Sequence, residues 1–453
     1  MYQHSVRINR LKCVGCISCI KSCPTEAIRI QNGKAKILDE RCVDCGLCLS
    51  VCPHKAMVSV TTPLSDLGRF KYNIVIPSTT LYSQFRGLVD IADIYAGLYA
   101  LGFDAIYEEA KAAEILAEAV SRHIHSPNAV FPVISCTCPV VPRIVSVLYP
   151  NLIENLSPFV PSNELAARIA KQEFCETVGV PGDEVGAYYI SPCAAETTHM
   201  KNPCGIEKSS IDGVIAVRDV YAHLLNFVGK SSSLPEHQRS IVHRAGAFGL
   251  GSAVIGGLSA AVGTEHYLAL DGISDMIQCF DEIDNDRIRN LTFVEAMACK
   301  GGCVGGPLTF ENQFVAKNRN RRLQYSQPRI DLEADEHVQK YIDSDMLRYD
   351  KPITPHNIMK LSDDVVEAMK MMDKLEEVNK RLPGLDCGSC GSPTCRTLAE
   401  DIVKGETNAD ECTVNMRMLF HEYLNKRKEG VPADAFPADK IIKRTTPESG
   451  DKQ

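Results

Sequence analysis

Apolar, β-rich runs alternate with helical patterns between about residues 70 and 310. The runs that we interpret as strands are Tyr72–Ile76, Ala129–Ile134, Val185–Ile190 and Gly213–Val217. Short runs of this kind, separated by helical stretches, predict an α/β domain whose strands are largely buried. Ligands in open α/β sheets usually bind beyond the carboxyl ends of the strands. The loops that follow these runs are therefore the first places to search for chemistry.

Residues 1–60 have a different pattern, in which an internal repeat encloses a predicted hairpin. Ala27–Ile37 reads as two short strands joined by an Asn-Gly turn, which is a strong hairpin signal. Each copy of the repeat carries four cysteines and a proline, and Cys42 of the second copy follows Cys13 of the first by 29 positions (42 − 13). The sequence thus predicts a small, pseudo-symmetric α+β module.

The C-terminal third predicts a linker and a helical unit. The stretch from about Gln313 to Lys351 is charged and poor in apolar residues, so we expect a linker there, within a central domain of residues 70–345. The helical unit would cover residues 346–428. Its first helix begins at Ser362 and ends before Pro383, and its apolar positions, spaced by three and four, are Val365, Met369, Met372, Leu375 and Val378.

We expect the methionine pair of this helix to fill core space, as methionine usually does. Residues 429–453 are polar and contain proline, which predicts a tail.

One run, Ala245–Thr264, is almost free of charges and has the length of a membrane span. Its many glycines and small apolar side chains favour a buried, closely packed helix and turn instead. We therefore expect no membrane partner.

The composition excludes some classes of function. The chain has 453 residues, of which 45% are hydrophobic, so it can form two to four domains. A formal net charge of −8 leaves no basic excess for a nucleic-acid partner. The start of the chain has no apolar signal segment, so the 20 cysteines are expected to be reduced thiolates in the cytoplasm. The sequence leaves a homo-oligomer open.

The N-terminal repeat has the cysteine spacing of two iron–sulfur clusters. In such a run three thiolates wrap one cubane, and the fourth ligates the other cluster. A zinc site would not need two copies of the run, so we expect two [4Fe–4S] clusters. The expected ligands are Cys13, Cys16, Cys19 and Cys52 for one cluster, and Cys42, Cys45, Cys48 and Cys23 for the other.

A second group of cysteines lies near the C-terminus: Cys387, Cys390, Cys395 and Cys412. Four thiolates among tight glycine turns fit a tetrahedral site, and this geometry alone allows zinc or iron–sulfur. The stretch resembles the small helical [4Fe–4S] domain of corrinoid proteins and electron-transfer complexes. The resemblance implies one further [4Fe–4S] cluster.

The third group comes from separate loops of the predicted α/β domain and consists of Cys138, Cys193, Cys299 and Cys303. Glycines flank Cys303 on both sides, and glycine lets a backbone approach a bulky cofactor without Cβ clashes. A cluster held by distant loops lies in a cleft, whereas relay clusters lie in compact modules. This group therefore indicates catalytic use.

Residues 70–310 resemble the catalytic domain of [FeFe]-hydrogenases, a family that often carries the N-terminal module as well. Three family signatures have counterparts here: Thr-Ser-Cys-(Cys/Ser)-Pro in 135–139, Met-Pro-Cys-x-x-Lys in 191–196, and Glu-x-Met-Ala-Cys-x-Gly-Gly-Cys in 295–303. The resemblance implies a ferredoxin-like N-terminal module before an α/β hydrogenase catalytic domain. It also implies interconversion of protons and electrons with H2, a redox partner such as ferredoxin, and diiron maturation factors.

The resemblance further implies roles for single residues. The four cysteines of the third group would ligate the cubane of an H-cluster, and Cys303 would also bridge to a diiron subsite with CO and CN ligands. Met297 would pack against that subsite, and Pro77 and Ser78 would line its pocket.

Two residues depart from the family pattern. Thr137 replaces the proton-relay cysteine, and a hydroxyl is not usefully acidic near neutrality, so proton delivery should be slow or use another route. Cys136 could substitute only if the loop were shifted. Glu196 replaces a lysine that pairs with a cyanide ligand. A carboxylate there would repel the anion unless it is protonated or turned away.

These departures, the Cys-Pro-Val motif at 138–140 and the C-terminal cluster domain resemble the sensory group of the family. Our leading interpretation is a slow hydrogenase-like enzyme that senses hydrogen or redox state. The alternative is a non-catalytic electron-transfer or scaffold protein that has lost the diiron subsite. We expect the other cysteines to be unligated and mostly buried: Cys136, Cys175, Cys204 and Cys279.

Overall fold

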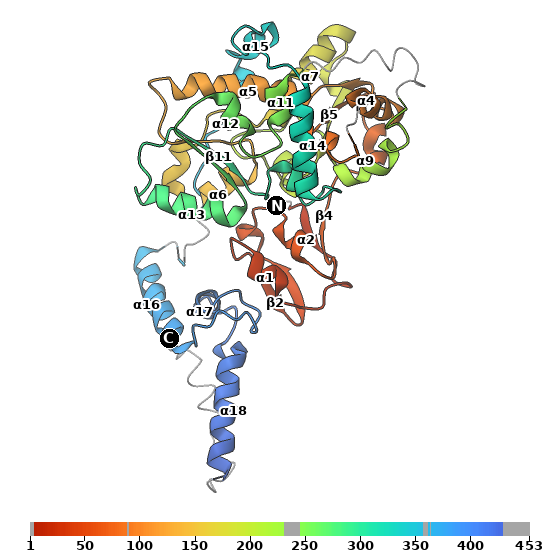
Figure 1. Cartoon of the computed structure of the whole chain (residues 1–453). Coiled ribbons are helices and arrows are strands. Elements are labelled where there is room, and N and C mark those ends of the chain that lie inside the picture. Colours follow the sequence, from red (N-terminus) through yellow and green to blue (C-terminus); the bar gives the residue numbers. More distant parts are fainter. Residues whose placement is uncertain (1–3, 88–89, 231–244, 357–360, 363, 429–453) are drawn as a thin grey trace. The chain divides into compact units, whose positions relative to one another are not determined.

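The computed structural model describes residues 4–87, 90–230, 245–356, 361–362 and 364–428 (Figure 1). The tail expected at residues 429–453 lies outside the described residues. The chain divides into two compact units. The first consists of Met1–Arg7, Val43–Gly46 and Ser59–His356, and the second of Ile8–Cys42, Leu47–Val58 and Asn357–Gln453.

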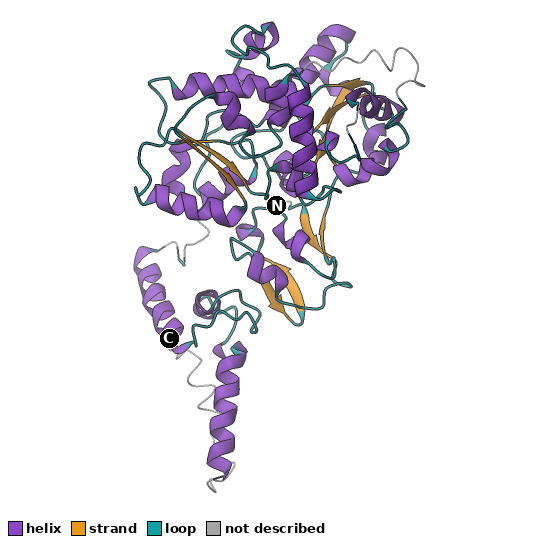
Figure 2. Ribbon diagram, in the orientation of Figure 1, coloured by secondary structure: helices purple, strands orange, loops and turns teal. Residues whose placement is uncertain are grey.

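Two parallel sheets form the frame of the first unit (Figure 2). The larger sheet has the strand order β6-β5-β8-β9, and the smaller has the order β10-β11-β7. All of their strand pairs are parallel. The strands of the larger sheet are β5 (Tyr72–Pro77), β6 (Ala105–Ile106), β8 (Val185–Ser191) and β9 (Gly213–Ala216). Those of the smaller sheet are β7 (Val133–Ile134), β10 (Tyr267–Asp271) and β11 (Phe293–Met297).

The predicted strands match β5, β8 and β9 closely, but the smaller sheet was largely missed. Only the last two residues of the predicted run Ala129–Ile134 are strand, because Pro132 lacks a backbone donor and Phe131 is exposed. No pattern in the sequence indicated β10 or β11. The buried Glu295 interrupts the apolar pattern of β11, and β10 is half exposed.

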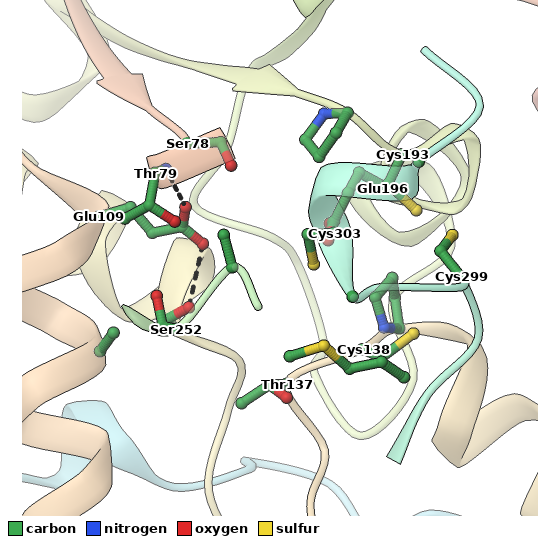
Figure 3. A pocket seen from close by; sticks show the side chains of 18 of the residues that line it. Ser78, Thr79, Glu109, Thr137, Cys138, Cys193, Glu196, Ser252, Cys299 and Cys303 are labelled. Atoms are coloured by element: carbon green, nitrogen blue, oxygen red, sulfur yellow. Dashed lines mark hydrogen bonds between the residues drawn. The ribbon is translucent and has the colours of Figure 1, made fainter. Parts of the chain in front are cut away.

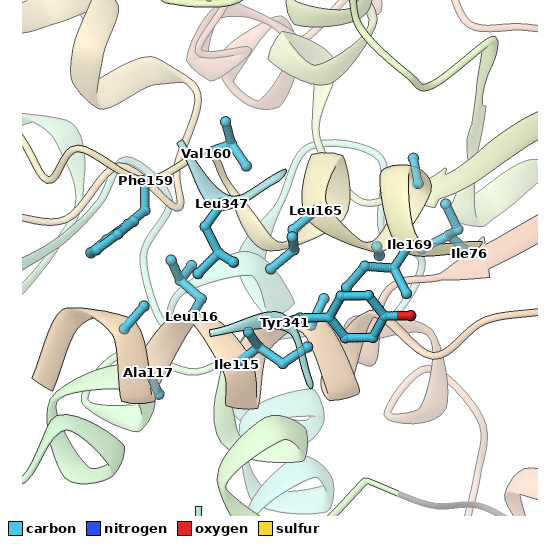
Figure 4. Close-up of a cluster of buried hydrophobic side chains, with 14 of the residues drawn as sticks. Ile76, Ile115, Leu116, Ala117, Phe159, Val160, Leu165, Ile169, Tyr341 and Leu347 are labelled. Carbon is cyan, nitrogen blue, oxygen red and sulfur yellow. The ribbon is translucent and has the colours of Figure 1, made fainter. Parts of the chain in front are cut away.

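Helices cover both faces of the larger sheet. Its alternating side chains divide between two cores, with Ile74 and Ile76 in one and Val75 in the other. Helix α7 packs on β5 and β8, and α5 packs on α7. Figure 4 shows this first core, where Leu116 of α5 and Leu165 of α7 lie among other apolar side chains.

The helices of the first unit follow the strands in chain order. They are α3 (Thr79–Tyr82), α4 (Ile91–Ala100), α5 (Glu109–Ile124), α6 (Val140–Leu148), α7 (Ser162–Val178), α8 (Ala194–Lys201), α9 (Val217–Leu224), α11 (Ala247–Gly251), α12 (Gly257–Val262), α13 (Ile273–Asp284), α14 (Gln313–Ser326) and α15 (Glu336–Tyr341). Short 3₁₀ turns also occur: η2 (Leu64–Gly68), η3 (Pro150–Asn155), η4 (Gly182–Glu184), η6 (Cys303–Gly305) and η7 (Asp345–Leu347).

The prediction of a linker at about Gln313–Lys351 was wrong. The segment forms α14 and α15, and its few apolar residues are buried in the two cores: Leu323, Leu332, Val338, Tyr341 and Leu347. The low average hydropathy of the segment concealed these residues, because one apolar residue per turn suffices to attach a polar helix.

The glycine-rich run Ala245–Thr264 forms α11, a turn and α12, as the preferred interpretation predicted. A Cβ on Gly249 would lie 2.1 Å from the carbonyl oxygen of Ala110 in α5. The glycines therefore allow close packing of backbone on backbone. Among the described residues, no helix is long and apolar enough to cross a membrane.

The second unit joins the N-terminal repeat to the C-terminal helices. The repeat forms β1 (Val6–Ile8), α1 (Ser18–Ser22), β2 (Ile28–Gln31), β3 (Lys34–Ile37), η1 (Asp39–Arg41), α2 (Leu47–Val51) and β4 (Met57–Ser59). Strands β2 and β3 pair antiparallel, which confirms the predicted hairpin. Asn32 and Gly33 at its turn both have positive φ, as a type I′ turn requires.

The C-terminal helices are α16 (Val365–Arg381), α17 (Cys395–Val403) and α18 (Thr413–Lys428), with η8 (Ala409–Glu411) between the last two. Helix α16 begins at the Asp364 cap and ends before Pro383, close to the prediction. The expectation that its methionines fill core was wrong, because Met369 is 65% exposed and Met372 is 42% exposed. Only Leu375 of this helix is buried.

The contact between α11 and α5 gives a test of the fold. Replacing Gly249 with alanine should destabilise the protein by about 1–3 kcal/mol, because the new Cβ would overlap the backbone of Ala110. Denaturant unfolding followed by circular dichroism measures the change. Gly68→Ala is the matched control, since a Cβ there meets nothing within 4 Å. Equal stabilities of the two variants would contradict the packing described.

Candidate metal centre

Both sheets of the first unit direct the carboxyl ends of their central strands toward one cavity. Ser78 follows β5, Cys193 follows β8, Cys138 follows β7 by four residues, and Cys299 follows β11. The loops after these strands supply most of the side chains in Figure 3. The general preference for ligands at strand ends thus correctly located this site from the sequence.

The cavity contains about 780 Å³ of space that no atom fills. Its lining includes all four cysteines of the third group, together with Ser78, Thr79, Glu109, Thr137, Tyr189, Glu196, Ser252, Met297, Gly302 and Gly306. In Figure 3 the cysteines group on one side, and Ser78, Thr79 and Glu109 lie on the other.

The four thiols are close enough to affect each other's ionisation. Burial raises the pKa of Cys193, Cys299 and Cys303, and the other thiols of the group raise it further. Burial also raises the pKa of Cys138. Such thiols lose their protons readily only when a cation compensates the charge, and iron bound as a cluster supplies that compensation. The donor set and the size of the cavity fit a cubane with room beside it.

The glycines around Cys303 have a second role besides lining the cavity. A Cβ on Gly302 would lie 2.7 Å from the oxygen of Ala253, and one on Gly306 would lie 2.4 Å from that of Pro192. The cysteine loop therefore packs directly on two neighbouring loops. The sequence analysis attributed these glycines to the approach of a cofactor alone.

Most residues that the family resemblance selected do lie at the cavity. Met297 is 3% exposed and lines it, as Ser78 does, but Pro77 at the end of β5 is not among the lining residues. The hydroxyl oxygen of Thr137 is buried and has no hydrogen-bond partner among the described residues. An orphaned polar atom at a cavity wall is what a bound group would satisfy.

Cys136 does not replace Thr137 at the cavity. It is buried but absent from the lining, and burial raises its pKa to about 12. Cys279 is also buried, whereas Cys175 and Cys204 are half-buried. Burial therefore holds for only two of the four cysteines that we expected to be unligated.

Glu196 lies at the cavity wall in a protonation state close to balance. Burial raises its pKa to about 8, and its Oε2 accepts a 2.7 Å hydrogen bond from Asn163. The buried guanidinium of Arg143, on α6, lowers this pKa and also acts on Cys193. The side chain is thus largely neutral at neutral pH. Of the two ways proposed to avoid repelling an anion, the structure favours protonation.

Glu109 is a cavity residue that the sequence analysis missed. Its carboxylate accepts hydrogen bonds from Ser162 Oγ at 3.0 Å, Tyr189 Oη at 3.1 Å and the Thr79 amide at 3.3 Å. Burial raises its pKa. Its position at the start of a helix after a predicted strand region gave no distinctive motif.

Glu295 is a second missed residue, and it acts away from the cavity. Its carboxylate accepts hydrogen bonds from the amides of Gly256 and Ser259 and from the Ser259 hydroxyl. These bonds attach β11 to the start of α12, whose Leu258 lines the cavity. The first residue of the Glu-x-Met-Ala-Cys signature therefore has a structural role.

Cys45 of the N-terminal repeat belongs to the first unit and lies within electrostatic reach of Cys299, whose pKa it raises. The rest of its expected ligand set, Cys23, Cys42 and Cys48, belongs to the second unit. That set therefore stays a prediction. The contact between Cys45 and Cys299 links the repeat to the central cavity.

The second unit has two smaller cavities, each lined by one expected set of ligands. Cys13, Cys16, Cys19 and Cys52 line a space of about 290 Å³. Cys387, Cys390, Cys395 and Cys412 line one of about 270 Å³. The structure thus brings Cys52 beside the first three cysteines of the repeat, which is the exchange of the fourth ligand that the spacing predicted.

Backbone amides point at the sulfur atoms in a pattern that repeats with the sequence. Ala27 donates to Cys23 Sγ at 3.3 Å, and Ala56 donates to Cys52 Sγ at 3.2 Å. Although burial opposes it, such amide donors lower the pKa of Cys52. Amide donors of this kind stabilise a thiolate and fit an iron–sulfur site.

An α/β unit with four buried thiols at its strand ends, linked to a cysteine-rich repeat, defines an iron–sulfur protein of the electron-transferring oxidoreductase class. A family model described as "Iron only hydrogenase large subunit, C-terminal domain" matches residues 80–269 and 263–307, half of the chain. The chain belongs to this family. A 4Fe-4S dicluster model matches residues 6–60, and an Fe-S cluster model matches residues 382–414.

Curated relatives agree with this assignment. Iron hydrogenase 1 of Clostridium pasteurianum is 24% identical over 375 residues, which is 67% of this chain and 64% of the relative. The NADP-reducing hydrogenase subunit HndD of Solidesulfovibrio fructosivorans is 21% identical over 351 residues, covering 65% and 55%. The chain therefore spans less than two thirds of the length of either relative.

Two further similarities concern parts of the chain or its fold. A component of the ion-translocating oxidoreductase complex of Rhodobacter capsulatus is 42% identical over 67 residues, which is 15% of this chain and 36% of the relative. A solved variant of [FeFe]-hydrogenase HydA1 from Chlamydomonas reinhardtii superposes with a TM-score of 0.49 at 14% identity, covering 65% of this chain and 98% of that chain.

The ligand assignment at the central cavity can be tested by iron content. Cys299→Ser should remove about four irons per chain from anaerobically reconstituted protein, because one thiolate of the cubane is lost. Chemical iron analysis together with electron paramagnetic resonance measures this loss. Cys175→Ser, at a cysteine outside the cavity, should keep the full content. Unchanged iron in the Cys299 variant would remove it from the ligand set.

Proposed function

We propose that this protein binds an H-cluster in the central cavity and interconverts protons and electrons with H2. The proposed reaction is slow and serves hydrogen or redox sensing. Family membership supports the hydrogenase class, and the absence of an acidic relay group at Thr137 supports the low rate.

One observation carries the proposal. Cys138, Cys193, Cys299 and Cys303 line a single cavity that extends beyond them to Met297 and Ser78. These cysteines would hold the cubane, and the additional space would receive a diiron subsite. When bound, that subsite supplies the metal chemistry that forms or cleaves H2.

The chain's own residues would hold the proton and exclude water. Glu109 is the cavity carboxyl with three donors and a raised pKa, so its Oε atoms are suited to take up and return a proton. Thr137 can pass a hydrogen bond but cannot store a proton. Met297 and Leu258 exclude water from the same wall.

Electrons would travel through the expected cluster sites of the second unit, and Cys45 would link them to the cavity. Its electrostatic contact with Cys299 supports that link. The proposed partners are a ferredoxin-type redox protein and the factors that assemble the diiron subsite. The cysteine-lined cavities of the second unit support this electron route.

An iron–sulfur protein that retains the cubane and has lost the diiron subsite is the second candidate. Glu196 favours it, because a family lysine is replaced by a carboxyl at the cavity wall. The raised pKa of Glu196 and the nearby Arg143 weaken this argument, since both reduce the negative charge that the cavity presents.

Infrared spectroscopy distinguishes the two candidates. Protein matured anaerobically with diiron assembly factors should show carbonyl and cyanide stretching bands. The same sample should contain iron for every expected cubane and for the diiron subsite. If the cubane iron is complete and no such bands appear, the hydrogenase proposal fails and the electron-transfer alternative stands.

The role of Glu196 gives a separate prediction. Glu196→Lys should increase the infrared band intensity per chain, because a cation at the cavity wall attracts anionic ligands. Glu196→Gln is the matched control. It should resemble the native protein, since the native carboxyl is largely protonated at neutral pH. A lysine variant without any gain, in folded protein with complete cubanes, would contradict this account.

A further inference from the structure

The C-terminal cluster domain is attached to the N-terminal repeat inside the second unit by a buried ion pair. Arg29 of β2 donates from Nε and Nη2 to the two carboxylate oxygens of Asp401 on α17, at 2.5 Å and 3.0 Å. Arg29 is 3% exposed and Asp401 is 6% exposed. A two-pronged, buried arginine–carboxylate pair fixes both position and orientation.

Further polar contacts surround this pair. Arg41 donates to Glu400 at 2.8 Å, and Thr397 donates to Glu26 at 2.6 Å. These contacts come from successive turns of α17 and from both sides of the hairpin. The helix is therefore held along its length rather than at one point.

The backbone of the domain also completes the hairpin. The Ile30 amide, on β2, donates to the carbonyl oxygen of Gly391 at 2.8 Å. A Cβ on Gly391 would lie only 2.2 Å from the Ile30 oxygen. Only glycine allows this approach, and Gly391 directly follows the expected ligand Cys390.

The contact places the two sets of cysteines next to each other. Lys21, between Cys19 and Cys23, donates to the carbonyl oxygen of Asp386, which precedes Cys387. A Cβ on Gly388 would lie 3.4 Å from Ile20 Cδ1. The loop that carries Cys387 thus lies against α1, which carries Cys19.

We infer that the C-terminal four-cysteine domain is a fixed redox partner of the N-terminal repeat, fastened by the Arg29–Asp401 pair and the Ile30–Gly391 bond. Its cluster would be one station of a continuous electron relay rather than a separately moving module. Electron tunnelling weakens steeply with distance, so a relay needs this kind of rigid contact. The inference rests on the proposed function only in requiring that both cysteine sets hold clusters.

Hydrogen exchange tests the attachment directly in the full-length holoprotein. The Ile30 amide should be protected in the native protein and should exchange about tenfold faster or more in Asp401→Asn, which removes the charge that Arg29 needs. Glu377→Gln is the control, because it breaks an exposed pair with Arg381 within α16. Protection of Ile30 that persists in the Asp401 variant would overturn the attachment.

A glycine pair repeats the test without removing a buried charge. Gly391→Ala should lose the Ile30 protection, because the new Cβ displaces the loop. Gly405→Ala adds the same strain of a positive φ in the same domain but meets nothing within 4 Å, so it should keep the protection.

Electron paramagnetic resonance of the reduced holoproteins tests the relay. The native protein and both controls should show magnetic coupling between the C-terminal cluster and a cluster of the repeat, and the two interface variants should lose it while their iron content stays complete. Coupling that is absent from the native protein, or unchanged in both interface variants, would overturn the relay. The infrared bands do not enter this test, so a failure of the hydrogenase proposal is recognised separately.

Discussion

The central structure depends on the burial of four thiols in one cavity. Removing a thiolate from water is unfavourable, and here each thiol raises the pKa of its neighbours as well. A polypeptide without a metal would gain nothing from this arrangement. A bound cluster reverses the balance, because it replaces the protons and stabilises the loops that supply the ligands. The two parallel sheets can place such loops together because their strands end at one cavity.

The same burial determines how charge is distributed around the cavity. Glu109 and Glu196 both have raised pKa values, and each acquires hydrogen-bond donors that fix its orientation. Arg143 adds a buried positive charge on the side of Glu196 and Cys193. The local electrostatic balance is therefore shared among residues on several elements. A motif comparison that considers position 196 alone reads it as a simple reversal of charge.

The sequence located the cysteines far better than it located their surroundings. Strict spacing marks the ligands of a cluster, and alternating patterns mark β5 and β8, so both were accessible without coordinates. Glu109, Glu295 and Arg143 carry no local signature, because their roles arise only when distant segments meet. The supposed linker failed for a related reason. Its helices are polar on average and are held by isolated side chains such as Leu347.

Glycine shows how close approach connects these levels. Gly302 and Gly306 allow the Cys303 loop to touch neighbouring loops, while Gly391 allows a cysteine loop of the second unit to touch the hairpin. In each case the absent Cβ lies next to a ligand-bearing turn. The precision of the cysteine positions therefore comes from backbone contacts that no longer side chain would permit. Because these contacts lie outside the cysteine spacing, the spacing defines the chemistry, and the glycines define where that chemistry is held.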